Sequence, residues 1–136
     1  MIATQEQDLV KEVARLTDGK GAGVAFDPVG GPAFAQLAEA VSNGAILVVY
    51  GRFSPEATPL PIVHVIWKGL TIRGFGLLSI VADAAKFAAL KRFIGEGFAE
   101  GALRPTIAKV FSFDEIVAAH RYLEAGEQIG KVIVTV

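Results

Sequence analysis

The stretch from Gly23 to Gly31, GVAFDPVGG, constrains the fold of this chain more than any other. Its apolar run ends in Asp-Pro-Val-Gly-Gly, which predicts a buried strand over residues 23–27 followed at once by a tight turn. Paired glycines let the backbone turn sharply and let a ligand approach it closely. In an open parallel sheet, ligands bind where the carboxyl ends of the strands meet the loops. The stretch therefore predicts a ligand-binding α/β sheet.

The residues before this strand do not supply the start of a dinucleotide-binding fold, which opens with a strand, a Gly-rich phosphate turn and a helix. Residues 1–22 instead predict one helix over 5–18, opened by a capping box of Thr4 and Gln7 and ended by Gly19. Three other segments have closely spaced glycines without the phosphate-turn pattern: Gly19–Gly21, Gly74–Gly76 and Gly95–Gly97. We therefore expect the second half of a cofactor domain, beginning after the part that would hold a pyrophosphate.

A second helix and a second strand follow the glycine turn. Pro32 suits the first turn of a helix, and we expect Gly44 to end it. The side chains expected to point inward from this helix are Phe34, Leu37, Ala38 and Val41. Residues 45–50, AILVVY, are apolar at every position, which predicts a strand covered on both faces, as in a parallel sheet. Together with the strand at 23–27, these elements make a βαβ unit.

The segment after the second strand is less regular. Residues 51–61 contain three prolines and are expected to form a loop. Residues 60–68 are predicted as either a short buried helix or an extended segment, in which His64 and Trp67 belong to the core or to an interface. A third strand is predicted over 71–75, where an arginine and a glycine interrupt the apolar pattern as in an edge or interface strand.

The last third of the chain predicts two helices and two strands. A long helix carries an apolar stripe made of Phe87, Leu90, Ile94 and Phe98. A strand over 107–111 leads into a helix opened by a capping box of Ser112 and Glu115 and ended by Gly126. A closing strand is predicted over 131–136. The alternation of strands and helices along the whole chain predicts an α/β fold.

Composition excludes several functional classes. The chain has 136 residues and no Cys, and its two His, His64 and His120, have no acidic neighbour at ligand spacing, so we expect no metal site. The net charge of −1 offers no field for a polyanion, so nucleic acid is not an expected partner. The longest apolar runs, such as 60–67, are far shorter than the roughly 20 residues that cross a bilayer. With no signal-peptide pattern, we expect a cytoplasmic protein without membrane contact.

Three glycine-containing segments follow predicted strands and are candidates for a ligand site: Asp27–Gly31, Tyr50–Phe53 and Phe75–Leu77. Because parallel strands end at the same edge of a sheet, we expect these segments to meet. Two alternatives stay open here. Asp27 and the glycines could simply connect a strand to a helix, with the Asp side chain satisfying local amides. Arg52 could be a solvated residue, or its guanidinium could contact a phosphate.

Several motifs, taken in order and spacing, resemble one known family along essentially the whole chain. They are Ile2-Ala3-Thr4, Asp27-Pro28-Val29-Gly30-Gly31, Tyr50-Gly51-Arg52, Leu70–Phe75, Phe113–Glu124 and Gly130–Val134. The chain resembles the C-terminal part of a medium-chain dehydrogenase/reductase of the zinc-type alcohol dehydrogenase superfamily, in the branch of zinc-independent quinone oxidoreductases related to zeta-crystallin. The resemblance implies a truncated Rossmann-type parallel sheet over residues 1–101, lacking its first strands and Gly-rich loop. Residues 102–136 would return to the family's catalytic domain.

The same resemblance implies an NADPH-dependent reductase that transfers hydride to a quinone, or to an activated alkene or carbonyl compound, without a metal. The substrate and the choice between NADPH and NADH stay open. The residues implied to contact the cofactor are Val29 and Gly30 near the ribose and nicotinamide, then Gly51, Arg52 and Phe53, and finally Gly76 and Leu77 beside the nicotinamide. No catalytic residue is assigned.

The resemblance covers only part of such an enzyme, so the chain alone is expected to be inactive: hydride transfer needs cofactor and small-molecule substrate held in one geometry. Loss of the first strands would leave the strand at 23–27 as an apolar edge, which predicts a homodimer or a larger homo-oligomer. The strand at 71–75 is a second candidate contact. Two other hypotheses are a non-catalytic dimerising or ligand-binding module, and an unrelated α/β domain whose three strands are not consecutive parallel neighbours.

Overall fold

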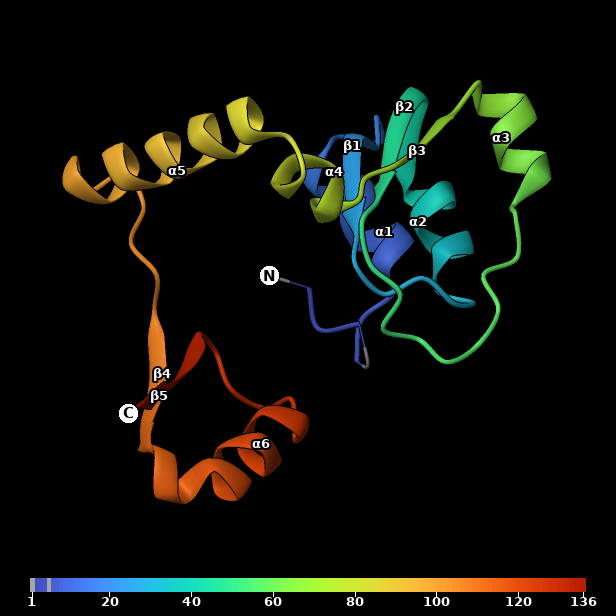
Figure 1. Ribbon diagram of the computed structural model, residues 1–136. Coiled ribbons are helices and arrows are strands. Elements are labelled where there is room, and N and C mark those ends of the chain that lie inside the picture. Colours follow the sequence, from blue (N-terminus) through green and yellow to red (C-terminus); the bar gives the residue numbers. More distant parts are fainter. Residues whose placement is uncertain (1, 5) are drawn as a thin grey trace. The chain divides into compact units, whose positions relative to one another are not determined.

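The computed structural model describes residues 2–4 and 6–136 (Figure 1). The chain divides into two compact units, Met1–Ala82 and Asp83–Val136. The first contains a three-stranded sheet in the order β1-β2-β3, and the second contains the two-stranded sheet β4-β5. Both sheets are parallel and alternate with helices along the chain, which confirms the α/β prediction. The predicted domain boundary after residue 101 concerns the family's domains and stays a prediction.

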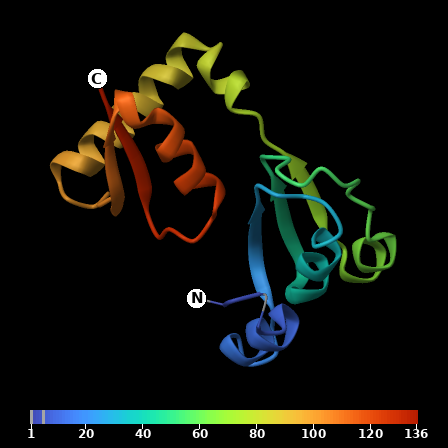
Figure 2. The same ribbon diagram turned by 90° about the horizontal axis from the view of Figure 1, so that it is seen from below.

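The first sheet consists of β1 (Ala22–Asp27), β2 (Val41–Val49) and β3 (Thr71–Gly74), seen side by side in Figure 2. The strands are consecutive parallel neighbours, and their registers place Phe26 opposite Val48 and Val48 opposite Arg73. This is the strand order that the cofactor-domain interpretation predicts, and it is not the order expected of an unrelated α/β domain. β1 lies at one edge of the sheet and β3 at the other.

The first helix, α1 (Leu9–Leu16), begins later than the predicted helix over 5–18. Its N-cap is Asp8, whose carboxylate accepts from the backbone N–H of Lys11 at 3.1 Å. A carboxylate at this position also interacts favourably with the helix dipole, which explains why Asp8 and not Thr4 starts the helix. The side chain of Gln7 accepts from the backbone N–H of Ala3 within a preceding turn. Residue 5 itself lies outside the described residues.

The boundary between α2 (Phe34–Ala40) and β2 also differs from the prediction. Helix and strand meet directly at Val41, whose φ of −85° and ψ of 159° are extended, so the expected helix end at Gly44 is wrong. Between the pairs Ala22–Val41 and Val24–Ile46 the register shifts, and the regular ladder begins only at Ile46. A β-branched valine favours extended backbone, which outweighs the helical spacing that places Val41 on the inner face of α2.

The core of the first unit lies on one face of the sheet. It is made of Phe34, Ala38, Val41, Ala45, Leu47 and Leu70. Along β2, buried Ala45 and Leu47 alternate with Ile46, which is 40% exposed. The prediction that this strand is covered on both faces is therefore wrong for the described residues, because strand side chains alternate between faces and the core occupies one of them.

Two helices complete the first unit. The segment at 60–68 contains α3 (Ile62–Lys68), which confirms the helical alternative. The helix is not buried: Trp67 is 83% exposed, so its expected place in the core is wrong and an interface stays a prediction. A short helix, α4 (Leu77–Val81), follows β3. Among residues 2–4 and 6–136, no helix combines the length and the hydropathy needed to cross a membrane.

The second unit contains α5 (Ala84–Ala99), β4 (Ile107–Ser112), the 3₁₀ turn η1 (Phe113–Glu115), α6 (Ile116–Glu124) and β5 (Lys131–Thr135). The predicted capping box of Ser112 and Glu115 is present. Phe111 and Ala119 are buried between α6 and the two strands, and the rings of Phe111 and Tyr122 lie 5.8 Å apart. The apolar stripe of α5 is half-buried or exposed, with Phe98 52% exposed.

Candidate functional site

All seven predicted cofactor-contacting residues lie at one edge of the first sheet. The strand registers place Asp27 opposite Val49 and Val49 opposite Gly74, so the three strands end together. The segments that follow them carry the predicted residues, which are Val29, Gly30, Gly51, Arg52, Phe53, Gly76 and Leu77. We call this edge, with its three segments, the carboxyl edge. Cofactor binding by these residues stays a prediction.

The turn after β1 is fixed by the side chain of Asp27, which is only 3% exposed. Its carboxylate accepts from the backbone N–H groups of Val29 at 2.8 Å and of Gly30 at 3.0 Å. Gly30 and Gly31 follow with φ of 68° and 70°, a left-handed conformation that favours glycine. The local alternative raised from the sequence, in which Asp27 satisfies nearby amides, therefore describes how this turn is built.

The loop after β2 packs directly onto this turn. The backbone N–H groups of Phe53 and Ser54 donate to the carbonyls of Pro28 and Val29 at 3.3 and 2.9 Å. A Cβ on Gly51 would collide with the carbonyl oxygen of Pro28, so the close approach of the two segments requires glycine there. The turn and the loop thus form one hydrogen-bonded assembly, which brings the predicted residues of both segments together.

One further contact closes this assembly. The backbone N–H of Gly31 donates to the hydroxyl of Thr58 at 2.7 Å, across 27 residues of sequence. With this bond, the N–H groups of Val29, Gly30 and Gly31 all have protein partners. Glycine turns that cradle phosphate do so through N–H groups directed at the anion. The turn after β1 is therefore built as a shaped support for neighbouring groups and not as a phosphate cradle.

An apolar hollow of about 270 Å³ lies beside the carboxyl edge, on the sheet face opposite the core. Its lining residues are Phe26, Val48, Tyr50 and Phe75. Three of them are aromatic, namely Phe26 in β1, Tyr50 directly after β2 and Phe75 directly after β3, and they are 67%, 50% and 45% exposed. Aromatic walls of this kind suit a planar ring, which they contact through offset or edge-to-face packing.

The segments that follow β2 and β3 carry exposed side chains that supply charge and further apolar surface. Arg52 is exposed, and none of the ion pairs found within 2–4 and 6–136 involves its guanidinium. Phe53 is 81% exposed and Leu77 58%. A guanidinium next to apolar side chains can bind an anionic group attached to a planar ring.

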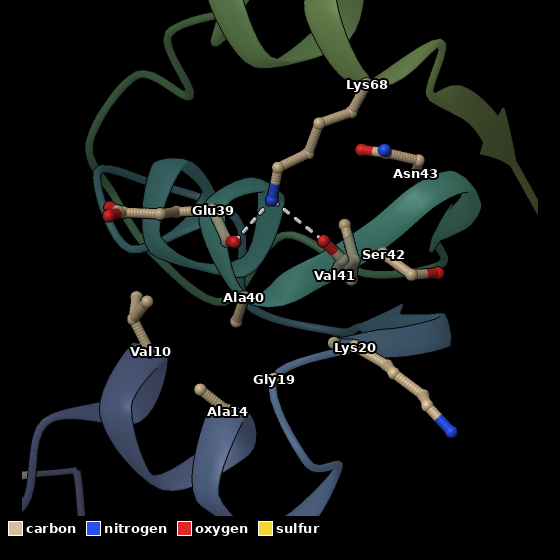
Figure 3. Close-up of a pocket in the computed structure, with 11 residues that line it drawn as sticks. Val10, Ala14, Gly19, Lys20, Glu39, Ala40, Val41, Ser42, Asn43 and Lys68 are labelled. Atoms are coloured by element: carbon tan, nitrogen blue, oxygen red, sulfur yellow. Dashed lines mark hydrogen bonds between the residues drawn. The ribbon is translucent and has the colours of Figure 1, made fainter.

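A larger hollow, of about 540 Å³, lies at the opposite edge of the sheet, where the strands begin (Figure 3). We call it the amino-edge hollow. Lys68 from α3 reaches into it, and its ammonium donates to the backbone carbonyls of Ala38, Glu39 and Val41. These carbonyls end α2, and cations near a helix C-terminus satisfy such groups and interact favourably with the helix dipole. Lys68 therefore has a structural role.

Sequence reasoning missed Thr58 and Lys68. Thr58 lies in a loop between prolines, and nothing in its local pattern indicates a partner 27 residues away. Lys68 offers a weak signal, because it ends an apolar segment directly before Gly69, where a cation commonly stands in the last turn of a helix.

Among the described residues, three carboxyl groups have a shifted pKa, and all three take part in helix N-caps. Hydrogen bonds from the backbone N–H groups of Lys11, Lys86 and Ser112 lower the pKa of Asp8, Asp83 and Glu115 respectively. None of these groups lies at the carboxyl edge. Over the described ranges, no cluster of three or more His, Cys, Asp or Glu could hold a metal ion.

Comparison with known proteins identifies relatives along nearly the whole chain. The profile of the zinc-binding dehydrogenase family matches residues 2–134. A protein of Schizosaccharomyces pombe named "Probable quinone oxidoreductase" is 26% identical over 97% of the chain, and a 2-haloacrylate reductase of a Burkholderia species is 24% identical over 93%. The chain spans 40% and 39% of the lengths of these two relatives.

The fold has counterparts among solved structures. A mycobacterial protein crystallised with NADPH superposes with a TM-score of 0.81 over 94% of this chain and 39% of its own, at 17% identity. At this identity the superposition establishes a shared fold.

Proposed function

Because the chain belongs to the zinc-binding dehydrogenase family, within the medium-chain dehydrogenase/reductase superfamily, we propose that it supplies the nicotinamide-binding part of an NADPH-dependent oxidoreductase. The reaction is hydride transfer to a quinone or to an activated alkene or carbonyl compound. The names of the relatives support these substrate classes, and NADPH in the mycobacterial structure supports the cofactor. The observation that carries the proposal is the meeting of three strand ends at the carboxyl edge.

The carboxyl edge suits the nicotinamide half of such a cofactor. NADPH supplies the hydride when bound. Val29 and Gly30 contribute backbone at the turn, Gly51 and Phe53 contribute the adjoining loop, and the Arg52 guanidinium is available for a phosphate oxygen. Gly76 and Leu77, with the aromatic walls of the neighbouring hollow, complete the surface against a flat ring. These groups orient the ring and exclude water from one of its sides.

The residues of this chain do not fit a zinc site. Zinc is held by Cys, His and carboxylate side chains in tetrahedral sets. The chain has no Cys, and His64 lies on α3 while His120 lies on α6. No step of the proposed reaction is therefore derived through a metal.

The proposed activity requires the rest of the enzyme. We infer that this chain corresponds to a Rossmann-type sheet without its first strands and Gly-rich loop, followed by a segment of the catalytic domain over 102–136. Since the chain spans two fifths of the relatives' length, the remaining part would hold the adenosine half of the cofactor and the small-molecule substrate. Hydride transfer depends on fixed geometry between the two reactants, so the chain alone is expected to be inactive.

The second candidate function is a non-catalytic dimerising or ligand-binding module on the same scaffold. β1 favours it, since this strand lies at the edge of its sheet with Val24 50% and Phe26 67% exposed. Apolar edge strands pair readily with another chain. We propose a homo-oligomer, with β1 as the first contact and β3 as the second, and light scattering at micromolar concentration tests it. A monomer would contradict this proposal.

Binding and activity measurements separate the two functions. NADPH fluorescence is followed with the wild-type chain, with Arg52→Ala, and with Arg92→Ala, which removes an arginine from α5 as a matched control. Loss of the phosphate contact in Arg52→Ala is expected to weaken binding about tenfold, and Arg92→Ala should bind as wild type does. Quinone-dependent NADPH oxidation is then assayed with the same proteins. Wild-type binding without oxidation fits the proposal, whereas no binding at all would contradict it and favour a module that only dimerises.

A further inference from the structure

We propose that Thr58 is a positioning residue, which holds the glycine turn and the loop of the carboxyl edge in the shape that receives the nicotinamide. The role rests on the proposed function. Its basis is the hydrogen bond from the Gly31 N–H to the Thr58 hydroxyl, at 2.7 Å. Gly31 is buried whereas Thr58 is exposed, so the hydroxyl serves a backbone group that solvent reaches poorly.

The two glycines of the turn are shaped to fit hydroxyl groups of the loop. A Cβ on Gly30 would stand 2.8 Å from the Thr58 hydroxyl oxygen. A Cβ on Gly31 would collide with the Ser54 hydroxyl. Both glycines also have left-handed backbone conformations. The turn therefore needs glycine for two reasons, the backbone conformation and the space taken by Ser54 and Thr58.

Thr58 also attaches the far part of the loop to the glycine turn. Among the described residues 55–61, it is the one with a hydrogen bond to this turn. The N–H of Glu56 donates to Ser54 within the loop, and the carbonyls of Leu60 and Pro61 accept from the start of α3. On the near side, Phe53 and Ser54 are bonded to Pro28 and Val29. Arg52 and Phe53 thus lie in a loop held at both ends against one turn. Releasing the Thr58 end is expected to widen the range of positions that these two side chains adopt.

The test compares three variants of the full chain. Thr58→Val removes the hydroxyl with little change in volume, and Thr58→Ser restores it. Thr17→Val is the matched control, because the Thr17 hydroxyl accepts from the N–H of Gly21 at 2.9 Å at the opposite edge of the sheet. Each protein is measured for the amide hydrogen exchange of Gly31, with Leu47 as internal reference, and for binding of reduced nicotinamide mononucleotide by fluorescence.

Thr58→Val is expected to speed exchange at Gly31 about fivefold relative to Leu47, as loss of one hydrogen bond implies, and to weaken mononucleotide binding by a similar factor. Thr58→Ser and Thr17→Val should leave the exchange rate of Gly31 and the affinity for the mononucleotide near the wild-type values. Unchanged exchange at Gly31 in Thr58→Val would overturn the attachment itself. Faster exchange with unchanged binding would show a structural contact and overturn the positioning role.

The same measurements distinguish failure of the proposed function from failure of the role proposed for Thr58. If the wild-type chain shows no binding of reduced nicotinamide mononucleotide, the nicotinamide assignment is overturned, and with it the positioning of that ring by Thr58. The exchange rates at Gly31 still decide whether Thr58 holds the turn. A stability difference alone supports neither outcome, so thermal unfolding is measured for all variants and binding is compared at a temperature where each is folded.

Discussion

The two edges of the β1-β2-β3 sheet contain the same kind of hydrogen bond, but the bond has a different role at each edge. At each edge a glycine in the left-handed conformation donates its N–H to a threonine hydroxyl. At the amino edge Gly21 donates to Thr17, four residues away. At the carboxyl edge Gly31 donates to Thr58, 27 residues away. The first bond finishes a local turn, whereas the second joins two segments that each carry predicted ligand-contacting residues.

The edges differ further in what they leave available. The amino-edge hollow is the larger, but the ammonium of Lys68 is occupied by three backbone carbonyls. The carboxyl edge has a smaller hollow, yet it exposes aromatic walls and an arginine. The larger hollow thus has a cation that the fold itself uses, whereas the smaller one lies beside exposed aromatic and arginine side chains.

Gly51→Val should have the largest effect, because it should disrupt the packing of the loop on the turn at the carboxyl edge. Its Cβ would collide with the Pro28 carbonyl, so the loop must leave the turn or the backbone must shift. We expect the free energy of unfolding to fall by about 3 kcal/mol, measured by urea denaturation, with mononucleotide binding lost. Gly23→Val is the matched control in β1, because a Cβ there meets nothing within 4 Å. Equal losses in both variants would contradict the close-approach argument.

Lys68→Met should have the second largest effect, and this effect should be confined to the amino edge of the sheet. The substitution keeps much of the apolar stem but removes the donor to the carbonyls that end α2. We expect a loss of about 2 kcal/mol in unfolding free energy, the range for hydrogen bonds to a charged group. Lys20→Met, which removes an exposed ammonium from the same hollow, should change little. Weaker mononucleotide binding by folded Lys68→Met would contradict the separation of the two edges.

The smallest effect concerns pH and α1, whose N-cap is Asp8. The hydrogen bond from the Lys11 N–H holds the pKa of Asp8 below the usual value of an aspartate. Its contribution to stability is thus fully present above that value and is lost as the pH falls through the lowered pKa. Circular dichroism of wild type and Asp8→Asn should differ at pH 6 and converge towards pH 2. A constant difference at all pH values would contradict an ionic contribution.

The sequence predicted the parts of the fold that short-range patterns encode. Continuous apolar runs located β1 and β2, and the capping box of Ser112 and Glu115 located the start of η1, which leads directly into α6. Burial was predicted less well. Trp67 and the stripe on α5 are apolar at helical spacing, yet spacing does not reveal which face finds a partner within the chain.

The candidate site was predicted in position but not in construction. Parallel strands implied that the three glycine-containing segments meet, and they do at the carboxyl edge. The contact between Thr58 and Gly31 depends on the path of an irregular loop, which no periodicity encodes. The same holds for Lys68, whose partners lie about 30 residues earlier in the chain.

The most direct test of the proposed nicotinamide site is a backbone NMR titration of the chain with reduced nicotinamide mononucleotide, mapped residue by residue. The proposal predicts saturable shifts confined to residues 27–31, 50–58 and 74–77, with the amino-edge residues 19–21 and 40–43 unchanged. Shifts centred on the amino-edge hollow, or no saturable shifts at millimolar ligand, would contradict the assignment of the carboxyl edge as the nicotinamide site.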